Sequence, residues 1–460
     1  MSDTDAAAPE PLDPHVWRTV AVVCLGPFMT QIDSTVVNVS LSTLRDQLAS
    51  TIGAAQWVIS GYLLALALML PLNGWLVDRV GAKRLYLACF SAFTLASLLC
   101  GRAHTMEQLI AARVLQGIAG GLLAPMAQLM IARVAGRQIA RVMSYTTIPV
   151  LFAPIVGPVL AGAILRYASW PWLFFVNLPV GVTAVTLAAV LLPRDDASPA
   201  RRPFDALGFA LMSPGLACLV YGIEQATHAF GLACLGIGVA LVGAFVWHAR
   251  SKGSEALIDL SVFRNRVFAT GTRTQFLFNG LSYAGQLLVP LYLINGAGLS
   301  PTRAGWMLAP MGLGMMCVYP FMGPLTERFG FRKVATTGVT VALVGTLPFL
   351  WMAHAGFSLP VTIACMIVRG AGQGGVGIPS ISAAYSSVPK ARLSVATTAL
   401  NVVQRLGGPV ATTGLAIVLA ATMTPGAGGA GFMAAFVTLI GLHVLVLMSA
   451  SRLPVRIVQR

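Results

Sequence analysis

Only one of the 15 Asp and Glu residues, Asp33, falls inside a long apolar stretch of the chain and away from its ends. Helical spacing places Thr30, Ser34 and Asn38 on one stripe beside it, which predicts a polar strip that contains Asp33 and faces a wet interior. An ionisable side chain at membrane depth is costly and usually functional. Because desolvation and a nearby cation shift the proton affinity of a carboxyl group in opposite directions, Asp33 can bind and release protons as its surroundings change.

Three arginines, Arg113, Arg369 and Arg405, also fall inside apolar stretches. Arginine stays charged, so Arg113 is predicted to bias the Asp33 carboxyl or hold a water chain rather than carry the proton itself. Each residue also has a structural alternative. Asp33 could form an ion pair with an arginine that only holds two helices together, and Arg113 could form a helix-to-helix hydrogen bond to backbone or to Gln116. Arg369 precedes a similar Gln- and Gly-containing segment and is predicted to be the counterpart of Arg113, with a packing role as its alternative. Three arginines against one acid would permit an anionic substrate.

The composition defines the elements that carry these residues. The chain has 460 residues, of which 57% are hydrophobic and 10% charged, whereas soluble domains carry about 25% charged residues. Apolar runs that do not alternate must form helices within lipid, so the sequence predicts an all-α membrane protein. The predicted spans are 16–41, 53–75, 84–102, 106–131, 143–165, 172–192, 205–225, 230–249, 266–294, 304–324, 333–353, 360–382, 395–420 and 431–450.

The distribution of basic residues orients these fourteen spans. If the N-terminus is cytoplasmic, 23 of the 30 Lys and Arg residues lie on the cytoplasmic side, as the positive-inside rule requires. Both termini are therefore predicted to be cytoplasmic. The same topology explains the net charge of +15, so no nucleic-acid partner is expected. The acidic N-terminus does not resemble a signal peptide.

An internal repeat divides the chain. The segment Gly74–Arg84 recurs as Gly323–Lys333, with matching Gly, Leu, acidic, Arg and basic positions offset by 249 residues. The repeat predicts that the chain arose by internal duplication, with six-helix bundles at 14–193 and 253–460 and two inserted helices at 194–252. Two related bundles are typical of transporters that alternate access between the two sides of a membrane.

Four motifs carry a family resemblance. The segment 74–84 resembles the loop signature of the major facilitator superfamily, with Ala82 where a basic residue is common. The segment 32–41 resembles the first-helix signature of its fourteen-helix drug–proton antiporters, 113–121 resembles the helix 4 motif associated with proton transfer, and 153–162 resembles the helix 5 antiporter motif. The departures are mild: Ser40 and Ser42 replace the usual Ala and Pro, and alanine replaces glycine at two places in the helix 5 motif.

This resemblance implies the major facilitator fold and a proton-coupled antiporter that exports small amphipathic compounds or drugs from the cytoplasm. It implies a bacterial-type inner membrane, protons and a small-molecule substrate as partners within the lipid bilayer, and no cofactor beyond the proton gradient. Export of one specific metabolite or metal chelate is the alternative. A channel or membrane enzyme is disfavoured because no pore-lining ring, metal cluster or nucleophile–base pair is recognisable, and the seven cysteines lack the spacing of a metal site. Participation of periplasmic adaptor proteins stays open.

Three groups of residues complete the prediction. The gating loop, which can clasp the two bundles or simply anchor the topology, is predicted to contain Gly74, Asp78, Arg79, Gly81, Arg84, Glu327 and Arg328. The helix 5 motif, which gives either leak-tight or ordinary helix packing, contains Pro154, Gly157, Pro158 and Gly162. The candidate substrate cavity contains Thr30, Ser34, Asn38, Gln56, Trp57, Tyr62, Asn279, Tyr283, Gln286, Trp306, Met311, Asn401, Gln404 and Arg405.

Overall fold

The structure is a computed structural model that describes residues 13–195, 203–226, 228–423 and 429–455. Within these residues, fourteen helical segments are long and apolar enough to cross a membrane, which confirms the predicted number of spans. Several helices run a few residues beyond the predicted ends because their last turns carry polar residues, as at 52–80 and 302–329. The described part of the chain contains helices and no strand.

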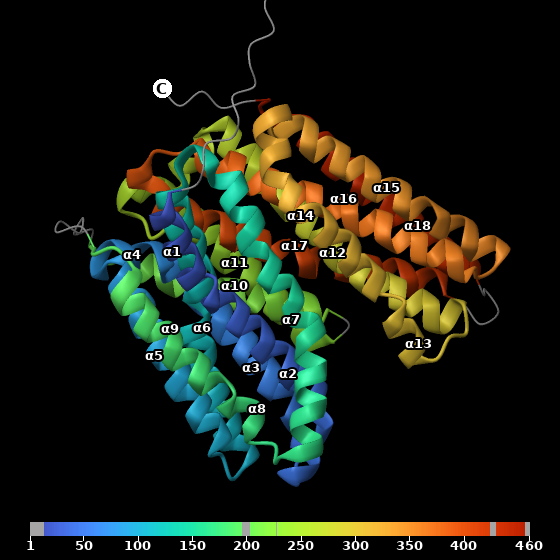
Figure 1. The fold of residues 1–460 in the computed structure, drawn as a ribbon, viewed down its shortest axis with the longest axis horizontal. Coiled ribbons are helices and arrows are strands. Elements are labelled where there is room, and N and C mark those ends of the chain that lie inside the picture. The colour runs from blue at the N-terminus through green and yellow to red at the C-terminus, as the bar shows by residue number, and fades with distance from the viewer. Residues whose placement is uncertain (1–12, 196–202, 227, 424–428, 456–460) are drawn as a thin grey trace, which may run out of the picture.

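The first bundle is formed by the N-terminal half of the chain (Figure 1). Its elements are α1 (Pro14–Val23), α2 (Leu25–Gln47), α3 (Ile52–Met69), α4 (Asn73–Val80), α5 (Ala82–Gly101), α6 (Met106–Ala135), α7 (Ile139–Tyr167), α8 (Trp172–Phe175) and α9 (Asn177–Leu191). Within it, α2 packs on α7, α3 on α6, and α5 on both α6 and α9.

The second bundle repeats this packing. Its elements are α12 (Arg266–Leu291), α13 (Pro301–Trp306), α14 (Ala309–Phe329), α15 (Phe331–Ala355), α16 (Leu359–Ser386), α17 (Leu393–Thr422) and α18 (Gly429–Ala450). Here α12 packs on α17, α14 on α16, and α15 on both α16 and α18. Each pair corresponds to a pair of the first bundle, as the 249-residue repeat predicts. The residue limits of the three predicted domains stay a prediction.

The two inserted helices, α10 (Ala206–Glu224) and α11 (Ala229–Lys252), pack on each other. Helix α10 also contacts α3 and α17, so it bridges the bundles. The buried Asp205 side chain begins α10 by accepting hydrogen bonds from the backbone amides of Gly208 and Leu257 and from the side chains of His248 and Lys252. Burial of this carboxyl, which precedes the membrane-spanning segment, raises its pKa, but the four donors outweigh burial and lower the pKa to about 2.

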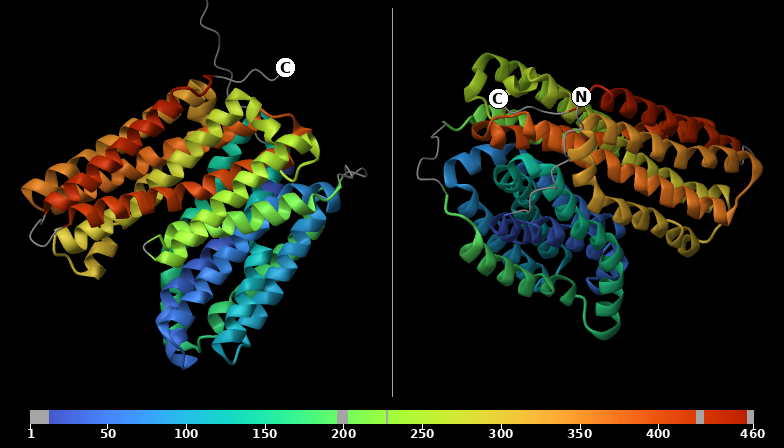
Figure 2. Two further views of the ribbon diagram at one scale, coloured as in Figure 1. Left: turned by 180° about the vertical axis from the view of Figure 1, so that it is seen from behind. Right: turned by 45° about the horizontal axis from the view of Figure 1, so that its top comes forward.

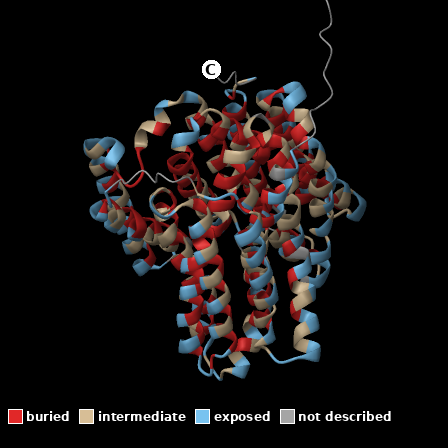
Figure 3. Ribbon diagram, turned by 60° about the vertical axis from the view of Figure 1, so that its left-hand side comes forward, coloured by how far each residue is buried: buried red, intermediate tan, exposed pale blue. Residues whose placement is uncertain are grey.

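The bundles meet at one end of the molecule and diverge toward the other (Figures 1 and 2). They meet where the described chain ends, and the short helices α8 and α13 lie at the far, separated ends. The bundles contact each other mainly where α14 packs on α7 and where α17 packs on α4. Buried residues gather around this meeting point, whereas the diverging helix ends carry many exposed residues (Figure 3).

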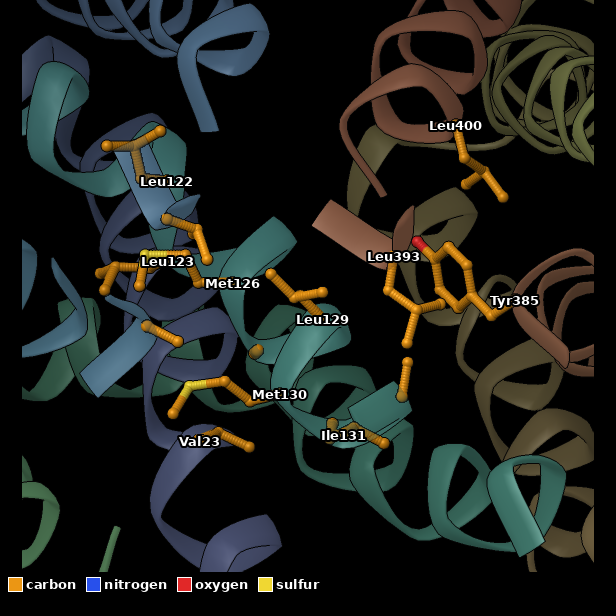
Figure 4. Close-up of a cluster of buried hydrophobic side chains, with 14 of the residues drawn as sticks. Val23, Leu122, Leu123, Met126, Leu129, Met130, Ile131, Tyr385, Leu393 and Leu400 are labelled. Atoms are coloured by element: carbon orange, nitrogen blue, oxygen red, sulfur yellow. The ribbon is translucent and has the colours of Figure 1, made fainter. Parts of the chain in front are cut away.

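An apolar cluster fills the space where the bundles meet. Leu129 and Ile131 of α6 lie across from Leu393 of α17 and Tyr385 of α16, and all four side chains are buried (Figure 4). Burial of such side chains stabilises the contact by about 1.5–3 kcal/mol each. This cluster, here called the apolar plug, therefore holds that end of the molecule closed.

Candidate functional site

A central cavity of about 500 Å³ lies between the two bundles. The first bundle lines it with side chains of α2, α3, α6 and α7, and the second lines it with side chains of α12, α14, α16 and α17. Its volume falls within the range of about 300–1,000 Å³ that is typical of small-molecule sites.

The lining of the cavity mixes amide, hydroxyl and apolar groups. Six lining residues carry side-chain amides: Gln31, Gln128, Gln275, Asn279, Asn401 and Gln404. Leu63, Leu66, Phe278 and Ile378 supply apolar surface, and Tyr62, Tyr283 and Tyr319 supply aromatic rings with hydroxyl groups. Among the described residues, Arg405 is the one charged side chain of the lining. Such a surface suits a compound with an apolar body and a few polar groups.

Asp33 lies beside this cavity but does not line it. Its carboxylate is 1% exposed and forms an ion pair with Arg113 of α6, with 2.5 Å between Asp33 Oδ2 and Arg113 Nη1. The side-chain amides of Gln116 and Asn177 donate to the other carboxylate oxygen, Oδ1, at 2.9 and 2.8 Å. The prediction that Asp33 faces a wet interior was therefore wrong. Thr30 and Ser34 face the cavity, whereas Asp33, on another side of the same helix, is covered by α6 and α9.

Arg113 forms the ion pair with Asp33 and also the hydrogen bonds to the backbone and to Gln116 that the sequence left open as alternatives. Its guanidinium pairs with Asp33, donates to the side-chain oxygen of Gln116 at 2.5 Å, and donates through Nε to the carbonyl of Val58 at 3.2 Å. Gln116 in turn donates to the Ser97 hydroxyl at 2.7 Å. This network joins α2, α3, α5, α6 and α9 through a single buried charge pair.

Tyr62 connects the buried pair to the cavity. The Arg113 guanidinium lies 4.1 Å from the centre of the Tyr62 ring, which is a cation–π contact. Tyr62 also lines the cavity, and its buried hydroxyl has no hydrogen-bond partner within the described part of the chain. One side chain therefore contacts both the buried charge pair and the cavity.

Arg369 occupies the corresponding place in the second bundle, where α16 matches α6. It is 1% exposed and packs against Gly285 of α12 and Gly345 of α15. Its Nε and Nη2 atoms have no hydrogen-bond partner among the described residues. The two bundles thus differ in chemistry, because among the described residues only the first bundle combines its buried arginine with an acid.

The structure brings together most, but not all, of the predicted cavity residues. Thr30, Ser34, Tyr62, Asn279, Tyr283, Asn401, Gln404 and Arg405 line the cavity. Asn38, Gln56, Trp57, Gln286 and Trp306 are exposed and lie outside this lining, as does the half-buried Met311. Polarity alone does not distinguish a side chain in the cavity from one nearer the end of a helix, where the bundles diverge.

Gln128 links the two bundles and was not predicted. Its side-chain oxygen accepts hydrogen bonds from the Tyr385 hydroxyl and from the Asn401 amide, both at 2.9 Å. Asn401 accepts from Gln404 at 2.9 Å, so the link continues along α17. These bonds lie next to the apolar plug, to which Tyr385 also belongs. A Gln within an apolar helix was the only signal in the sequence.

In the predicted gating loop, Gly74 and its counterpart Gly323 both lie in close contact with the opposite bundle. A Cβ atom on Gly74 would lie 3.1 Å from the Ser394 carbonyl oxygen of α17, and one on Gly323 would meet the Arg141 backbone of α7. Arg79, Arg84, Glu327 and Arg328 are exposed, and Asp78 lies near Val395 of α17. The clasp of the two bundles by Asp78 and Arg79 stays a prediction, with Asp78 placed beside the second bundle and Arg79 exposed.

Gly81 is the turn between α4 and α5, and its φ of +96° is readily adopted only by glycine. The Asp195 carboxylate, which was not predicted as a site residue, lies against this glycine. It accepts hydrogen bonds from the backbone amides of Lys83 and Arg84 at 2.8 and 3.1 Å. In the second bundle, Gly330 has a φ of +84°, and the carbonyl of Val455 accepts from the amide of Phe331. Each loop is therefore held by the segment that follows the last helix of its bundle.

The helix 5 motif lies in α7, where Gly157 packs against Thr35 of α2. Pro158 is half-buried in the same helix. Gly162 has open space around its Cα, so its role as a packing residue is not supported. The side chain of Pro154 lies outside the described residues.

Comparisons with known proteins agree with this architecture. The profile of the Major Facilitator Superfamily matches residues 23–412. The chain is 35% identical over 419 residues to the multidrug resistance protein B homolog of Mycobacterium tuberculosis, covering 89% of this chain and 77% of the relative. It is 34% identical over 359 residues to the putative multidrug resistance protein MdtD of Klebsiella pneumoniae, covering 74% of each. A solved structure of a double tryptophan mutant of XylE has a similar fold, with a TM-score of 0.69, 12% identity, and coverage of 96% of this chain and 97% of that one.

Proposed function

The chain belongs to the major facilitator superfamily, and we propose that it is a proton-coupled antiporter that exports small amphipathic compounds, including drugs, from the cytoplasm. The names of its relatives, multidrug resistance protein B homolog and putative multidrug resistance protein MdtD, support this substrate class. The positive-inside distribution supports an inner membrane of a bacterial type with both termini cytoplasmic.

The buried pair of Asp33 and Arg113 is the observation that carries proton coupling. A carboxylate inside a membrane protein is usually retained for function, and protonation of Asp33 would remove the charge that neutralises Arg113. Because the guanidinium stays charged, the network around it must rearrange when the proton binds. The Tyr62 ring, which contacts Arg113 and lines the cavity, gives this rearrangement a direct route to a bound substrate.

The closed end of the molecule supports an outward-facing state. The apolar plug, the Gln128 hydrogen bonds and the Gly74 contact all lie at the end where the charge distribution places the cytoplasm. In the proposed cycle, proton binding at Asp33 favours a change in which these contacts separate and those at the opposite end form. The cavity then takes up a substrate from the cytoplasm, the proton leaves on that side, and the reverse change releases the substrate outside.

Purified protein in proteoliposomes provides the test. A fluorescent amphipathic compound is loaded, and its transport is followed with an imposed pH gradient, without one, and after nigericin has collapsed it. Export driven by protons predicts accumulation against the compound's own gradient only while the pH gradient persists. Accumulation that is insensitive to nigericin would contradict proton coupling, and absence of transport for every compound tested would contradict the proposed function.

A further inference from the structure

Building on the proposed function, we propose that the central cavity selects amphipathic compounds that carry a negative charge, and that Arg405 of α17 binds the anionic group. A carboxylate or sulfonate attached to a flat apolar body is the chemistry that the cavity fits. Four observations on the cavity wall support this assignment.

The first observation is the state of Arg405 itself. Its side chain is half-buried at the wall of the cavity, and it makes no hydrogen bond or ion pair within the part of the chain that the structure describes. Asp33 already neutralises Arg113, so Arg405 has no counter-charge from that source. A guanidinium offers five N–H donors in a planar fork that matches a carboxylate or sulfonate.

The second observation is the set of neutral polar groups beside Arg405. Gln404 and Arg405 follow Asn401 by three and four residues, so each of them neighbours Asn401 on the surface of the helix. Asn401 and Gln404 are held in place by the hydrogen bonds that lead to Gln128. Arg405 is therefore presented to the cavity from a fixed wall, not from a mobile loop.

The third observation is the absence of any acid in the lining. None of the described residues that line the cavity is Asp or Glu. Asp33, which the sequence predicted as the acid of the cavity, is buried outside the lining. It pairs with Arg113 and accepts hydrogen bonds from Gln116 and Asn177. A cationic compound would therefore meet the unpaired Arg405 charge without an acid to offset it, and charges interact strongly where water is scarce.

The fourth observation is the surface available to the rest of the compound. Leu63, Leu66, Phe278 and Ile378 line the same cavity and can cover an apolar body. Tyr62 lines the same cavity as Arg405 and is in contact with Arg113. An anionic group at Arg405 would therefore lie close to the side chain that connects the cavity to the proton site.

A set of three compounds on one scaffold tests the charge preference by binding. The probes are 2-naphthylacetate, the neutral 2-naphthylacetamide and the cation (2-naphthylmethyl)trimethylammonium, and binding is measured by equilibrium dialysis with protein in phosphatidylcholine nanodiscs at neutral pH. The wild type should bind the anion about tenfold to a hundredfold more tightly than the cation, the size expected for a charge-assisted contact. Arg405→Gln should abolish this preference, and Arg405→Lys should retain part of it.

Arg303→Gln is the matched control, because it removes the same charge from an exposed position outside the cavity. It should bind all three probes like the wild type. Equal binding of anion and cation by the wild type, or a preference that survives Arg405→Gln, would overturn the inference, as would failure of the folded protein to bind any probe.

Transport of the same probes separates this inference from the proposed function. If the cation is pumped as well as the anion under a pH gradient, the inference fails and proton-coupled export stands. If a wider panel of amphipathic compounds of every charge is not pumped, the proposed function fails. Pumping of the anion that is reduced by Arg405→Gln and unchanged by Arg303→Gln would support both.

Discussion

The Arg113 guanidinium lies 4.1 Å from the centre of the Tyr62 ring, and the same ring forms part of the cavity wall. One aromatic side chain therefore separates the buried charge pair from the space available to a substrate. A cation–π contact in such a desolvated place is worth about 2 kcal/mol. In the proposed antiporter, this contact makes the position of Arg113 depend on what occupies the cavity.

Tyr62→Leu is expected to uncouple transport, because it removes the ring that holds Arg113. Tyr62→Phe keeps the ring and should retain most coupling, since the Tyr62 hydroxyl has no partner within the described residues. The measurement is the ratio of gradient-driven transport to substrate counterflow, which should fall about tenfold for the leucine variant. Equal ratios for the two variants would show that the cation–π contact has no part in coupling.

Gln128→Ala is expected to weaken the closed end of the molecule, because it removes the acceptor for Tyr385 and Asn401. Each of these two hydrogen bonds stabilises the closed form by about 1 kcal/mol, so the ratio of the form open at that end to the closed form should rise roughly thirtyfold. Pairs of spin labels placed across the closed end would report this change by their distance distribution. Gln56→Ala, at an exposed position outside the cavity lining, should leave the distribution unchanged. An unaltered distribution in Gln128→Ala would remove Gln128 from the gate.

Gly323→Ala and Gly74→Ala are expected to slow turnover, because each added methyl group enters a contact between the bundles. The effect should be larger at Gly323, where the methyl group would meet the backbone of Arg141, than at Gly74, where it would approach Ser394 and Thr398 at about the limit of normal contact. Substrate affinity should change less than about twofold, since neither glycine lines the cavity.

Gly162→Ala in α7 is the control for these two variants, because open space surrounds its Cα. It should transport at the wild-type rate. Comparable slowing in all three variants would mean that helix propensity, and not the contact between bundles, explains the effect.

The sequence predicted the fourteen spans and the duplication, because each depends on hydropathy or on spacing along the chain. It also singled out Asp33 as the acid within a span, whose role in coupling stays a prediction. It did not predict that Asp33 would be covered. Thr30 and Ser34 were correctly expected at the cavity, but the adjacent Asp33 contacts Arg113 and Asn177, which are 80 and 144 residues away in sequence. Such contacts depend on how helices pack, which local periodicity does not specify.

Gln128 and Asp195 show the same limit. Gln128 links the two bundles through residues 257 and 273 positions away, and Asp195 accepts a hydrogen bond from Lys83, which lies 112 positions earlier. By contrast, Gly74 and Gly81 could be recognised from the repeated motif. The motif did not reveal that Gly74 itself lies in close contact with the second bundle.

Asp205→Asn is expected to destabilise the protein by about 2 kcal/mol, because the charged carboxylate accepts four hydrogen bonds at the start of α10. The folded pKa of about 2 is below the ordinary value of 3.8, so this stabilisation is present above about pH 4 and is lost as the pH falls toward 2. Thermal unfolding followed by tryptophan fluorescence should show a lower midpoint at neutral pH, and the difference from wild type should shrink in acid.

Asp46→Asn provides the comparison, since the Asp46 carboxylate is exposed and pairs only with the neighbouring Arg45. Its midpoint should stay close to that of the wild type. A similar loss in both variants would indicate a general effect of charge rather than the buried hydrogen bonds of Asp205.

Asp33→Asn tests the central claim most directly, because asparagine keeps the size of the side chain and removes its titration. Proteoliposomes containing this variant are measured in two ways: accumulation of substrate under a pH gradient, and counterflow of labelled substrate without any gradient. We predict that accumulation is abolished while counterflow persists, which would show a folded transporter that has lost its coupling to protons. Accumulation at the wild-type rate and level would contradict the assignment of Asp33 as the proton-binding group.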